Sequence, residues 1–294
     1  MILIVYLYNL FKVVFFMIDL HTHTTYSDGT YSPTELIELA YKNGIKAIAI
    51  TDHDTVEGIN YAKEKAKELN IELINGIEFS VDYKGIEMHI LGYFLDINNK
   101  ELLNLLKDLK ITRDKRNLEL IEKLNSIGLD ISFDYIKSLS GGGLITKAHF
   151  ATAIVEKGYA KTRNEAFSLY LGRGKPAYVK RVLISHKEAI DFIYNSKGIS
   201  VLAHPIIYKL SNKDLDIAIK DLKDSGLKGI ECYYPSNTLS QTNFLISLAQ
   251  KYDLKITGGS DFHGLNRPNV SLGNIFLEKQ IDYKLLEDLK SIRR

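Results

Sequence analysis

The sequence contains little cysteine, little net charge and no evident internal repeat. Its single cysteine, Cys232, excludes an internal disulfide and a cluster of thiolate metal ligands. The scarcity of cysteine also fits a reducing compartment, so we expect a cytoplasmic protein. The formal net charge is only +2 over 294 residues, which gives no reason to expect bulk electrostatic binding to long duplex nucleic acid.

Long hydrophobic runs are missing except at the N-terminus. Residues 1–16, MILIVYLYNLFKVVFF, are strongly apolar, but a membrane-spanning helix needs about 20 apolar residues. They also lack the basic segment and the small-residue cleavage site of a signal peptide. We therefore expect no membrane association, and we interpret residues 1–16 as an N-terminal extension that precedes a fold beginning at Met17.

The chain after Met17 alternates between short apolar runs and amphipathic segments. The segment SPTELIELAYKNG begins with a capping box of Ser32 and Glu35 and has Pro33 at the first helical position. The run IKAIAIT that follows it is short and continuously apolar, which indicates a buried parallel strand. This alternation predicts an α/β fold built from β/α units, with about seven strands.

The alternation is interrupted once, which predicts two structural parts. Residues 17–98 and 183–294 carry the strand and helix pattern, and we assign them to a barrel. Residues 99–182 are mainly helical, and we predict that they form a helical insertion that caps the substrate site.

Residues that can bind metal ions follow the predicted strands. Six of the eight histidines and three carboxylates belong to this set. Its members are His21, His23, Asp28, His53, Glu78, His89, His204, Asp261 and His263. The carboxyl ends of parallel strands share one edge, so we expect these side chains to meet there. His89 lies near the start of its apolar run, and a hairpin would bring it to the same edge.

The chemistry of this set suggests more than one metal ion. Nine donors are too many for a single ion and suit two or three. Nitrogen and oxygen donors without sulfur favour manganese, with zinc or iron as alternatives. Three carboxylates against three divalent ions would leave a positive pocket, which suits an anionic substrate such as a phosphate ester.

Six ordered motifs resemble those of the polymerase-and-histidinol-phosphatase (PHP) family of metal-dependent phosphoesterases. They are DLHTHTTYSDGTYSP, AITDHDT, GIEFS, MHILGYF, LAHP and GSDFHG. The resemblance implies a distorted (β/α)7 barrel with a three-metal site. His21, His23, Glu78 and Asp261 would hold one ion, Asp28, His53 and His263 a second, and Glu78, His89 and His204 a third. A hydroxide bound near Glu78 and Asp261 would attack phosphorus, and no residue is assigned as the general acid.

Within the family, the predicted insertion resembles a subgroup that acts on nucleoside 3′,5′-bisphosphates and on short 5′-phosphorylated oligoribonucleotides. The segments that carry this resemblance are ITKAHFATAIVEKGYAKTRNEAF and YLGRGKPAYV. Arg113 and Arg116 lie three residues apart, hence on one helix face, where they could hold a phosphate. The subgroup usually has arginine where this chain has Lys147, which keeps the charge without the planar fork. The other candidate substrate contacts are His149 and Lys175.

Other functions compete with this interpretation. Histidinol phosphate phosphatase, or another small-molecule phosphatase, is the nearest alternative within the family, although the insertion motifs disfavour it. A metal-dependent amidohydrolase could use a similar barrel, but it commonly needs a bridging lysine, which is not seen at a predicted strand end. A non-catalytic phosphate sensor is a third possibility that the full set of metal donors disfavours.

Overall fold

The computed structural model describes residues 17–275 and 281–293. The predicted extension at residues 1–16 lies outside the described residues. In the described part of the chain, no helix is both long enough and apolar enough to cross a membrane.

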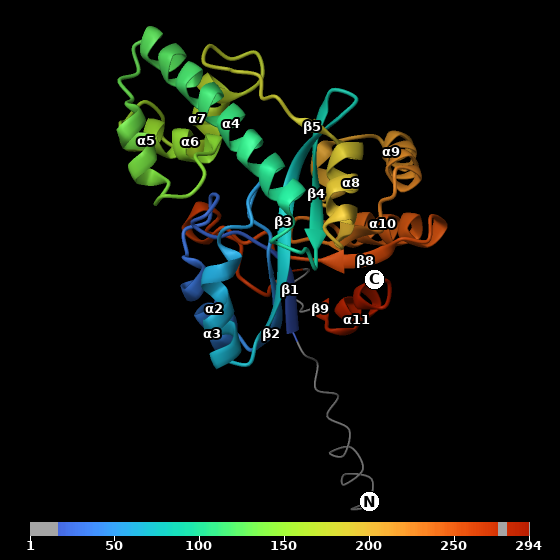
Figure 1. Ribbon diagram of the computed structural model, residues 1–294. Helices are drawn as coiled ribbons and strands as arrows, with labels where there is room; N and C mark the ends of the chain where they lie inside the picture. The colour runs from blue at the N-terminus through green and yellow to red at the C-terminus, as the bar shows by residue number, and fades with distance from the viewer. Residues whose placement is uncertain (1–16, 276–280, 294) are drawn as a thin grey trace, which may run out of the picture.

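One mixed sheet curls into a nearly closed barrel (Figure 1). Its strand order is β8-β7-β6-β4-β3-β2-β1-β9, and β5 pairs with β3 off this path. The strands are β1 (Met17–Thr22), β2 (Ile45–Ile50), β3 (Glu72–Tyr83), β4 (Ile86–Tyr93), β5 (Ile184–Ser185), β6 (Ile199–Leu202), β7 (Gly229–Tyr233), β8 (Lys255–Gly258) and β9 (Ile281–Asp282).

The segment after β8 closes the barrel against β1. The backbone of Asp261 donates to the His21 carbonyl at 2.8 Å, and the side chain of Asp19 accepts hydrogen bonds from both the backbone and the hydroxyl of Ser260. A glycine is required at position 259, because a Cβ there would lie 2.2 Å from the Cβ of His21. The two ends of the sheet therefore meet beside the first histidine of the predicted metal site.

Strand β4 runs antiparallel to both of its neighbours, β3 and β6. The prediction of a parallel sheet is therefore wrong for this strand, and the suggested hairpin exists. Ser80 pairs with His89 in it. Because β4 is reversed, its start lies at the edge where the parallel strands end. This explains how His89 reaches the same edge as the other donors.

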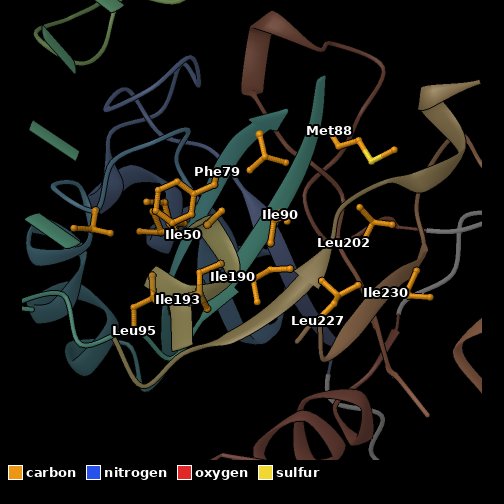
Figure 2. Packing of buried hydrophobic residues seen from close by; sticks show 14 of the residues in the cluster. Ile50, Phe79, Met88, Ile90, Leu95, Ile190, Ile193, Leu202, Leu227 and Ile230 are labelled. Atoms are coloured by element: carbon orange, nitrogen blue, oxygen red, sulfur yellow. The ribbon is translucent and has the colours of Figure 1, made fainter. Parts of the chain in front are cut away.

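Helices cover the outside of the barrel. They are α2 (Pro33–Lys42), α3 (Ile59–Glu68), α8 (His186–Asn195), α9 (Asn212–Asp224), α10 (Leu239–Lys251) and α11 (Lys284–Lys290). The capping box of Ser32 and Glu35 is confirmed at the start of α2, with Pro33 as its first residue. Figure 2 shows how Ile190 and Ile193 of α8 pack among apolar side chains of the sheet.

The segment between β4 and β5 is helical and lies above one end of the sheet (Figure 1). It contains α4 (Lys100–Ser126), α5 (Phe133–Leu139), α6 (Lys147–Glu156), α7 (Arg163–Ala166) and the π-helix η1 (Phe167–Leu171). Its apolar side chains form a cluster of their own, which runs from Leu120 to Val179 in the sequence. The loop before α6 touches the barrel closely: the backbone N–H of Leu144 donates to the Tyr26 carbonyl at 3.0 Å.

Candidate metal centre

All nine predicted donors meet at the carboxyl-terminal end of the parallel strands. They form four overlapping groups, and within each group the candidate ligand atoms lie within 4.8 Å of one another. The groups are His23, Asp28, His53 and His263; His21, Glu78 and His204; His21, His23 and Asp261; and His53, Glu78 and His89. We call these nine residues the donor cluster. Its groups overlap, and Glu78 belongs to two of them, as it does in the ligand sets that the family resemblance implies.

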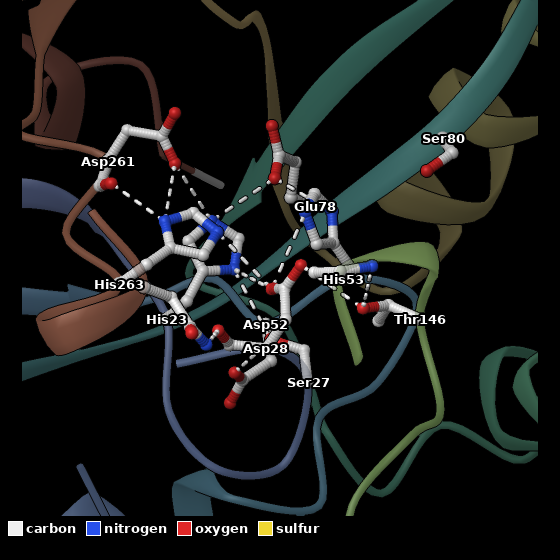
Figure 3. A network of polar contacts seen from close by, with 12 residues as sticks. His23, Ser27, Asp28, Asp52, His53, Glu78, Ser80, Thr146, Asp261 and His263 are labelled. Atoms are coloured by element: carbon white, nitrogen blue, oxygen red, sulfur yellow. Dashed lines mark hydrogen bonds and ion pairs between the residues drawn. The ribbon is translucent and has the colours of Figure 1, made fainter. Parts of the chain in front are cut away.

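Glu78 lies at the centre of the donor cluster (Figure 3). Its Oε1 lies between 2.8 and 3.3 Å from ring nitrogens of three histidines, which are His21, His89 and His204. Its Oε2 lies 2.9 Å from Nδ1 of His53 and 3.2 Å from Nε2 of His23. One fully buried carboxylate thus serves five imidazoles, which is the arrangement expected of a bridging ligand.

Two aspartates complete the donor cluster on either side of Glu78. Asp261 Oδ1 lies 3.2 Å from Nε2 of His23 and 3.5 Å from Nε2 of His21. Asp28 Oδ1 lies 3.2 Å from Nε2 of His263 and 3.8 Å from Nε2 of His53. The carboxylates are therefore spread among the histidines, so that each group of donors contains at least one negative charge.

The electrostatics of the donor cluster favour cations. Burial alone would raise the pKa of Glu78, but the surrounding histidines, His89 first, hold it well below its usual range. Burial would lower the pKa of His23, yet its contacts with Asp261 and Glu78 raise that pKa to about 10. The pKa of Asp28 is also held well below its usual range, against burial, chiefly by His263. Carboxylates that stay ionised in a buried site attract positive charge, which divalent ions can supply.

Unpartnered atoms provide a direct test of whether this cluster fits metal ions. Buried polar atoms almost always have hydrogen-bond partners. Among the described residues, buried atoms of several predicted donors make no hydrogen bond, including Nε2 of His21, Nε2 of His23, Oδ1 of Asp28, Nδ1 of His53 and Oε2 of Glu78. These are imidazole nitrogens and carboxylate oxygens pointing at one another, so the site fits a group of hard or borderline divalent ions.

Several residues that support the donors were not predicted from the sequence. Glu231 on β7 contacts Nδ1 of His21 at 3.0 Å and accepts a hydrogen bond from the backbone of His204 at 2.7 Å. Asp52 accepts hydrogen bonds from the hydroxyls of Thr24 and Ser27 and so shapes the loop that carries Asp28. A charged residue inside an otherwise apolar strand, as in KGIECYY, is the signal that could have identified Glu231.

A second group of charges lies beside the donor cluster. Four cations, Arg113, Arg116, Lys147 and Arg181, line a cavity of about 380 Å³. Asp28, His53 and His89 of the donor cluster line the same cavity. We call this cavity the cation pocket. Arg181 was not predicted; the other three cations were predicted substrate contacts.

The two predicted arginines of the cation pocket have different partners. Arg113 forms a buried ion pair with Asp54, which also binds Arg181. Arg116 is buried as well, but its Nε and Nη1 make no hydrogen bond among the described residues. Burial first, and then the positive charges of Arg113 and Arg181, lower the pKa of Arg116 to about 9. Arg116 is therefore a buried cation that lacks a counter-charge of its own.

The remaining predicted contacts lie in other positions. Lys147, the first residue of α6, has its Nζ 5.0 Å from the centre of the Tyr178 ring. His149 accepts a hydrogen bond at Nδ1 from the backbone of Thr146 and so caps α6. Lys175 is exposed. Neither His149 nor Lys175 lines the cation pocket.

A barrel with a multi-donor centre at the carboxyl ends of its strands is an arrangement typical of metal-dependent hydrolases. The chain belongs to the PHP domain family, whose pattern matches residues 19–197. It is a PHP phosphoesterase.

The chain is similar to proteins with related activities. It is 39% identical over 245 residues to a 5′-3′ exoribonuclease of Haemophilus influenzae, covering 83% of this chain and 89% of that protein. It is 32% identical over 258 residues to a 3′,5′-nucleoside bisphosphate phosphatase of Chromobacterium violaceum, covering 87% and 90%. A crystal structure from Bifidobacterium adolescentis, described as a predicted metal-dependent phosphoesterase, superimposes with a TM-score of 0.84 at 29% identity, covering 93% and 95%.

Proposed function

We propose that this PHP phosphoesterase acts on nucleotides that carry two phosphate groups. The substrate would be a nucleoside 3′,5′-bisphosphate or a short 5′-phosphorylated oligoribonucleotide. The phosphate that reacts would be the one on the 3′-oxygen of the 5′-phosphorylated nucleoside. The activities named for the Haemophilus and Chromobacterium relatives support this class. The observation in this chain that carries the proposal is the buried, unpartnered Arg116 beside the donor cluster.

The cation pocket has more positive charge than its own carboxylates can balance. Four cations face three carboxylates, Asp28, Asp54 and Glu87, and Glu87 lies 3.5 Å from Arg181. Burying a guanidinium without a partner is costly unless a ligand supplies the missing charge. A phosphate with two ionised oxygens matches the planar fork of an arginine. The pocket thus suits a phosphate that is bound but not cleaved.

The donor cluster would hold the phosphate that reacts. We propose that it binds two or three divalent ions, most plausibly Mn²⁺, through the nine donors named above. When bound, such ions polarise a phosphoryl group and activate water for attack on phosphorus. Water would supply the oxygen that joins phosphorus, the bond from phosphorus to the 3′-oxygen would break, and a proton would go to that leaving oxygen.

The chain's own residues would fix the position of the reacting phosphate relative to the second phosphate. Asp28, His53 and His89 belong to the donor cluster and also line the cation pocket. Tyr234 and Arg267 both bind Asp261 and hold it in place; the hydroxyl of Tyr234 donates at 2.8 Å. A nucleotide would span the two sites, with its 3′-phosphate at the donors and its 5′-phosphate at Arg116.

The proposal is tested by measuring kcat/KM for adenosine 3′,5′-bisphosphate and for a phosphomonoester without a second anion, such as phenyl phosphate. Chelation should abolish both activities, and Mn²⁺ should restore them. Arg116→Gln should lower kcat/KM for the bisphosphate roughly ten- to a hundredfold, the value of one charge-assisted contact of about 1.5–3 kcal/mol. The same variant should leave phenyl phosphate within twofold.

Two results would contradict the proposal. Equal losses on both substrates would show that Arg116 supports the fold or the metal site, and would favour histidinol phosphate or another monophosphate. Turnover of amide substrates instead of phosphate esters would favour the amidohydrolase alternative.

A further inference from the structure

A second cavity meets the cation pocket over the donor cluster. It has a volume of about 400 Å³. Asp28, His53, His89, Ala148 and Phe167 line both cavities. The second cavity has a different set of polar residues at its other end, namely Arg163, Asn164, Tyr234, Ser236, Asn266 and Arg267. The two cavities therefore form one groove with the donor cluster in its middle.

The cations at the two ends of the groove have different positive neighbours. The pKa of Arg116 is lowered by burial first and then by Arg113 and Arg181. The pKa of Arg163 is lowered by burial first, and Arg267 lowers it further while Asp28 opposes both. Arg116 thus lies near Arg113 and Arg181, whereas Arg163 lies near Arg267 and Asp28. A ligand that reached both would have to cross the donor cluster.

Arg163 is the cation at this second end whose charge is not already matched. Arg267 forms an ion pair with Asp261 and donates to the hydroxyl of Tyr234. Among the described residues, Arg163 by contrast donates from its side chain only to the backbone carbonyl of Asn266, at 2.9 Å. Among residues 17–275 and 281–293, no carboxylate lies within ion-pair distance of Arg163. Its charge is available for an anion in the groove.

The side chain of Arg163 is linked through Asn266 to the loop that carries Asp28. Asn266, whose carbonyl binds Arg163, donates from its side-chain amide to the carbonyl of Asp28 at 2.8 Å. Arg163 begins α7, where Thr162 caps the helix and Glu165 follows. A short chain of hydrogen bonds therefore connects the guanidinium of Arg163 to the loop that carries a predicted metal ligand.

We propose that Arg163 forms a subsite for the phosphodiester that follows the cleaved bond in an oligonucleotide. This inference rests on the proposed function. With the 5′-phosphate at Arg116 and the scissile phosphate at the donors, the strand that remains after cleavage would leave along the second cavity. Its next phosphate would reach Arg163. A nucleoside 3′,5′-bisphosphate has no group there, so Arg163 would raise kcat/KM for the longer substrate and not for the shorter one.

The test compares two substrates in four proteins. kcat/KM is measured for adenosine 3′,5′-bisphosphate and for a 5′-phosphorylated trinucleotide in the wild type, Arg163→Gln, Arg163→Lys and Lys161→Gln. Lys161 is a matched control, because it is an exposed cation two residues away that does not line the groove. Arg163→Gln should lower kcat/KM for the trinucleotide about tenfold. It should leave the bisphosphate within twofold, and Lys161→Gln should leave both substrates unchanged.

Two further readouts distinguish a phosphate contact from a structural effect. Arg163→Lys should recover part of the trinucleotide activity, because it keeps the charge. The slope of log kcat/KM against log salt for the trinucleotide should become shallower by about 0.7 in Arg163→Gln, the value for one phosphate of a single strand. Anisotropy of a labelled, phosphorothioate-linked trinucleotide with chelator present should show weaker binding by the same variant.

The possible failures are distinct. Equal losses on the two substrates, or no loss on the trinucleotide, would overturn the assignment of Arg163 while the proposed function stands. A wild-type protein that hydrolysed neither substrate would overturn the proposed function, and the subsite with it.

Discussion

The donor cluster and the cation pocket share a wall but handle charge in opposite ways. In the donor cluster, imidazoles and carboxylates alternate, and Glu78 alone contacts five histidines. In the cation pocket, four positive side chains face three carboxylates, which are Asp28, Asp54 and Glu87, and Arg116 has unpartnered donors. We propose that the first region holds cations and that the second holds an anion. Their shared residues, Asp28, His53 and His89, place the two kinds of ligand next to each other.

The largest effect should come from the centre of the donor cluster. Glu78→Gln removes the charge that contacts five histidines, whereas Asp28→Asn removes one that lies at the side of the cluster. Changing a residue that merely orients a metal ligand lowers activity roughly 10–100-fold. We expect Glu78→Gln to lower kcat/KM by more than this, and Asp28→Asn to lower kcat/KM less than Glu78→Gln does.

Metal content per chain, measured by mass spectrometry beside kcat/KM, checks this ranking. Glu78→Gln should lose more bound metal than Asp28→Asn. Similar losses in the two variants would show that Glu78 has no bridging role and would weaken the contrast with the cation pocket.

An effect of intermediate size is expected on stability, where substitution of Arg113 and substitution of Arg116 should differ. Arg113→Met leaves Asp54 with Arg181 as its one remaining ion-pair partner, and we expect a loss of roughly 1–3 kcal/mol in the free energy of unfolding. Arg116→Met removes a buried cation without a partner and should leave the melting temperature unchanged or raise it. The second variant should nevertheless lose bisphosphate activity.

Thermal unfolding of the metal-free variants, followed beside kcat/KM, provides the measurement. A domain of this size should shift by about 2–4 °C for each kcal/mol. If the melting temperature of Arg116→Met were as low as that of Arg113→Met, Arg116 would be a structural residue. Its buried charge would then be no evidence for an anion site in the cation pocket.

The smallest effect should come from Lys147. Lys147→Arg restores a planar fork in the cation pocket and should raise kcat/KM for the bisphosphate by a few-fold at most. The gain is limited because Lys147 already has the ring of Tyr178 5.0 Å away. Phenyl phosphate is the control substrate and should be unaffected. A loss of bisphosphate activity would indicate that the pocket has no room for the larger head group.

The donor cluster could be predicted from the sequence because its residues follow strands. Strand ends are marked by local patterns, as in AITDHDT and GIEFS, and parallel strands bring those ends together. Predicting the position of His89 also requires the direction of β4. That direction depends on the pairing between β3 and β4. The capping box of Ser32 and Glu35 was equally local and was confirmed.

The cation pocket could be predicted only in part, since its ion pairs join residues that are far apart in the sequence. The spacing of Arg113 and Arg116 places both on one face of α4, but it cannot show that Asp54 pairs with just the first. Arg181 and Glu231 act on residues far away in the sequence, and no local pattern connects them to the site. Contacts between distant segments depend on the packed fold, which residue spacing does not determine.

Helix α4 joins the two parts of the molecule as one continuous element of 27 residues, about 40 Å long. Leu102 and Leu106 near its start belong to the core of the barrel, whereas Leu120 and Leu124 belong to the core of the helical segment above it. Arg113 and Arg116 lie between these two anchors. A helix held at both ends loses little conformational entropy when a ligand arrives, because its side chains start from a fixed backbone. The affinity for the second phosphate would therefore depend on how firmly the two cores are packed, and a cavity cut into either one should weaken binding from a distance.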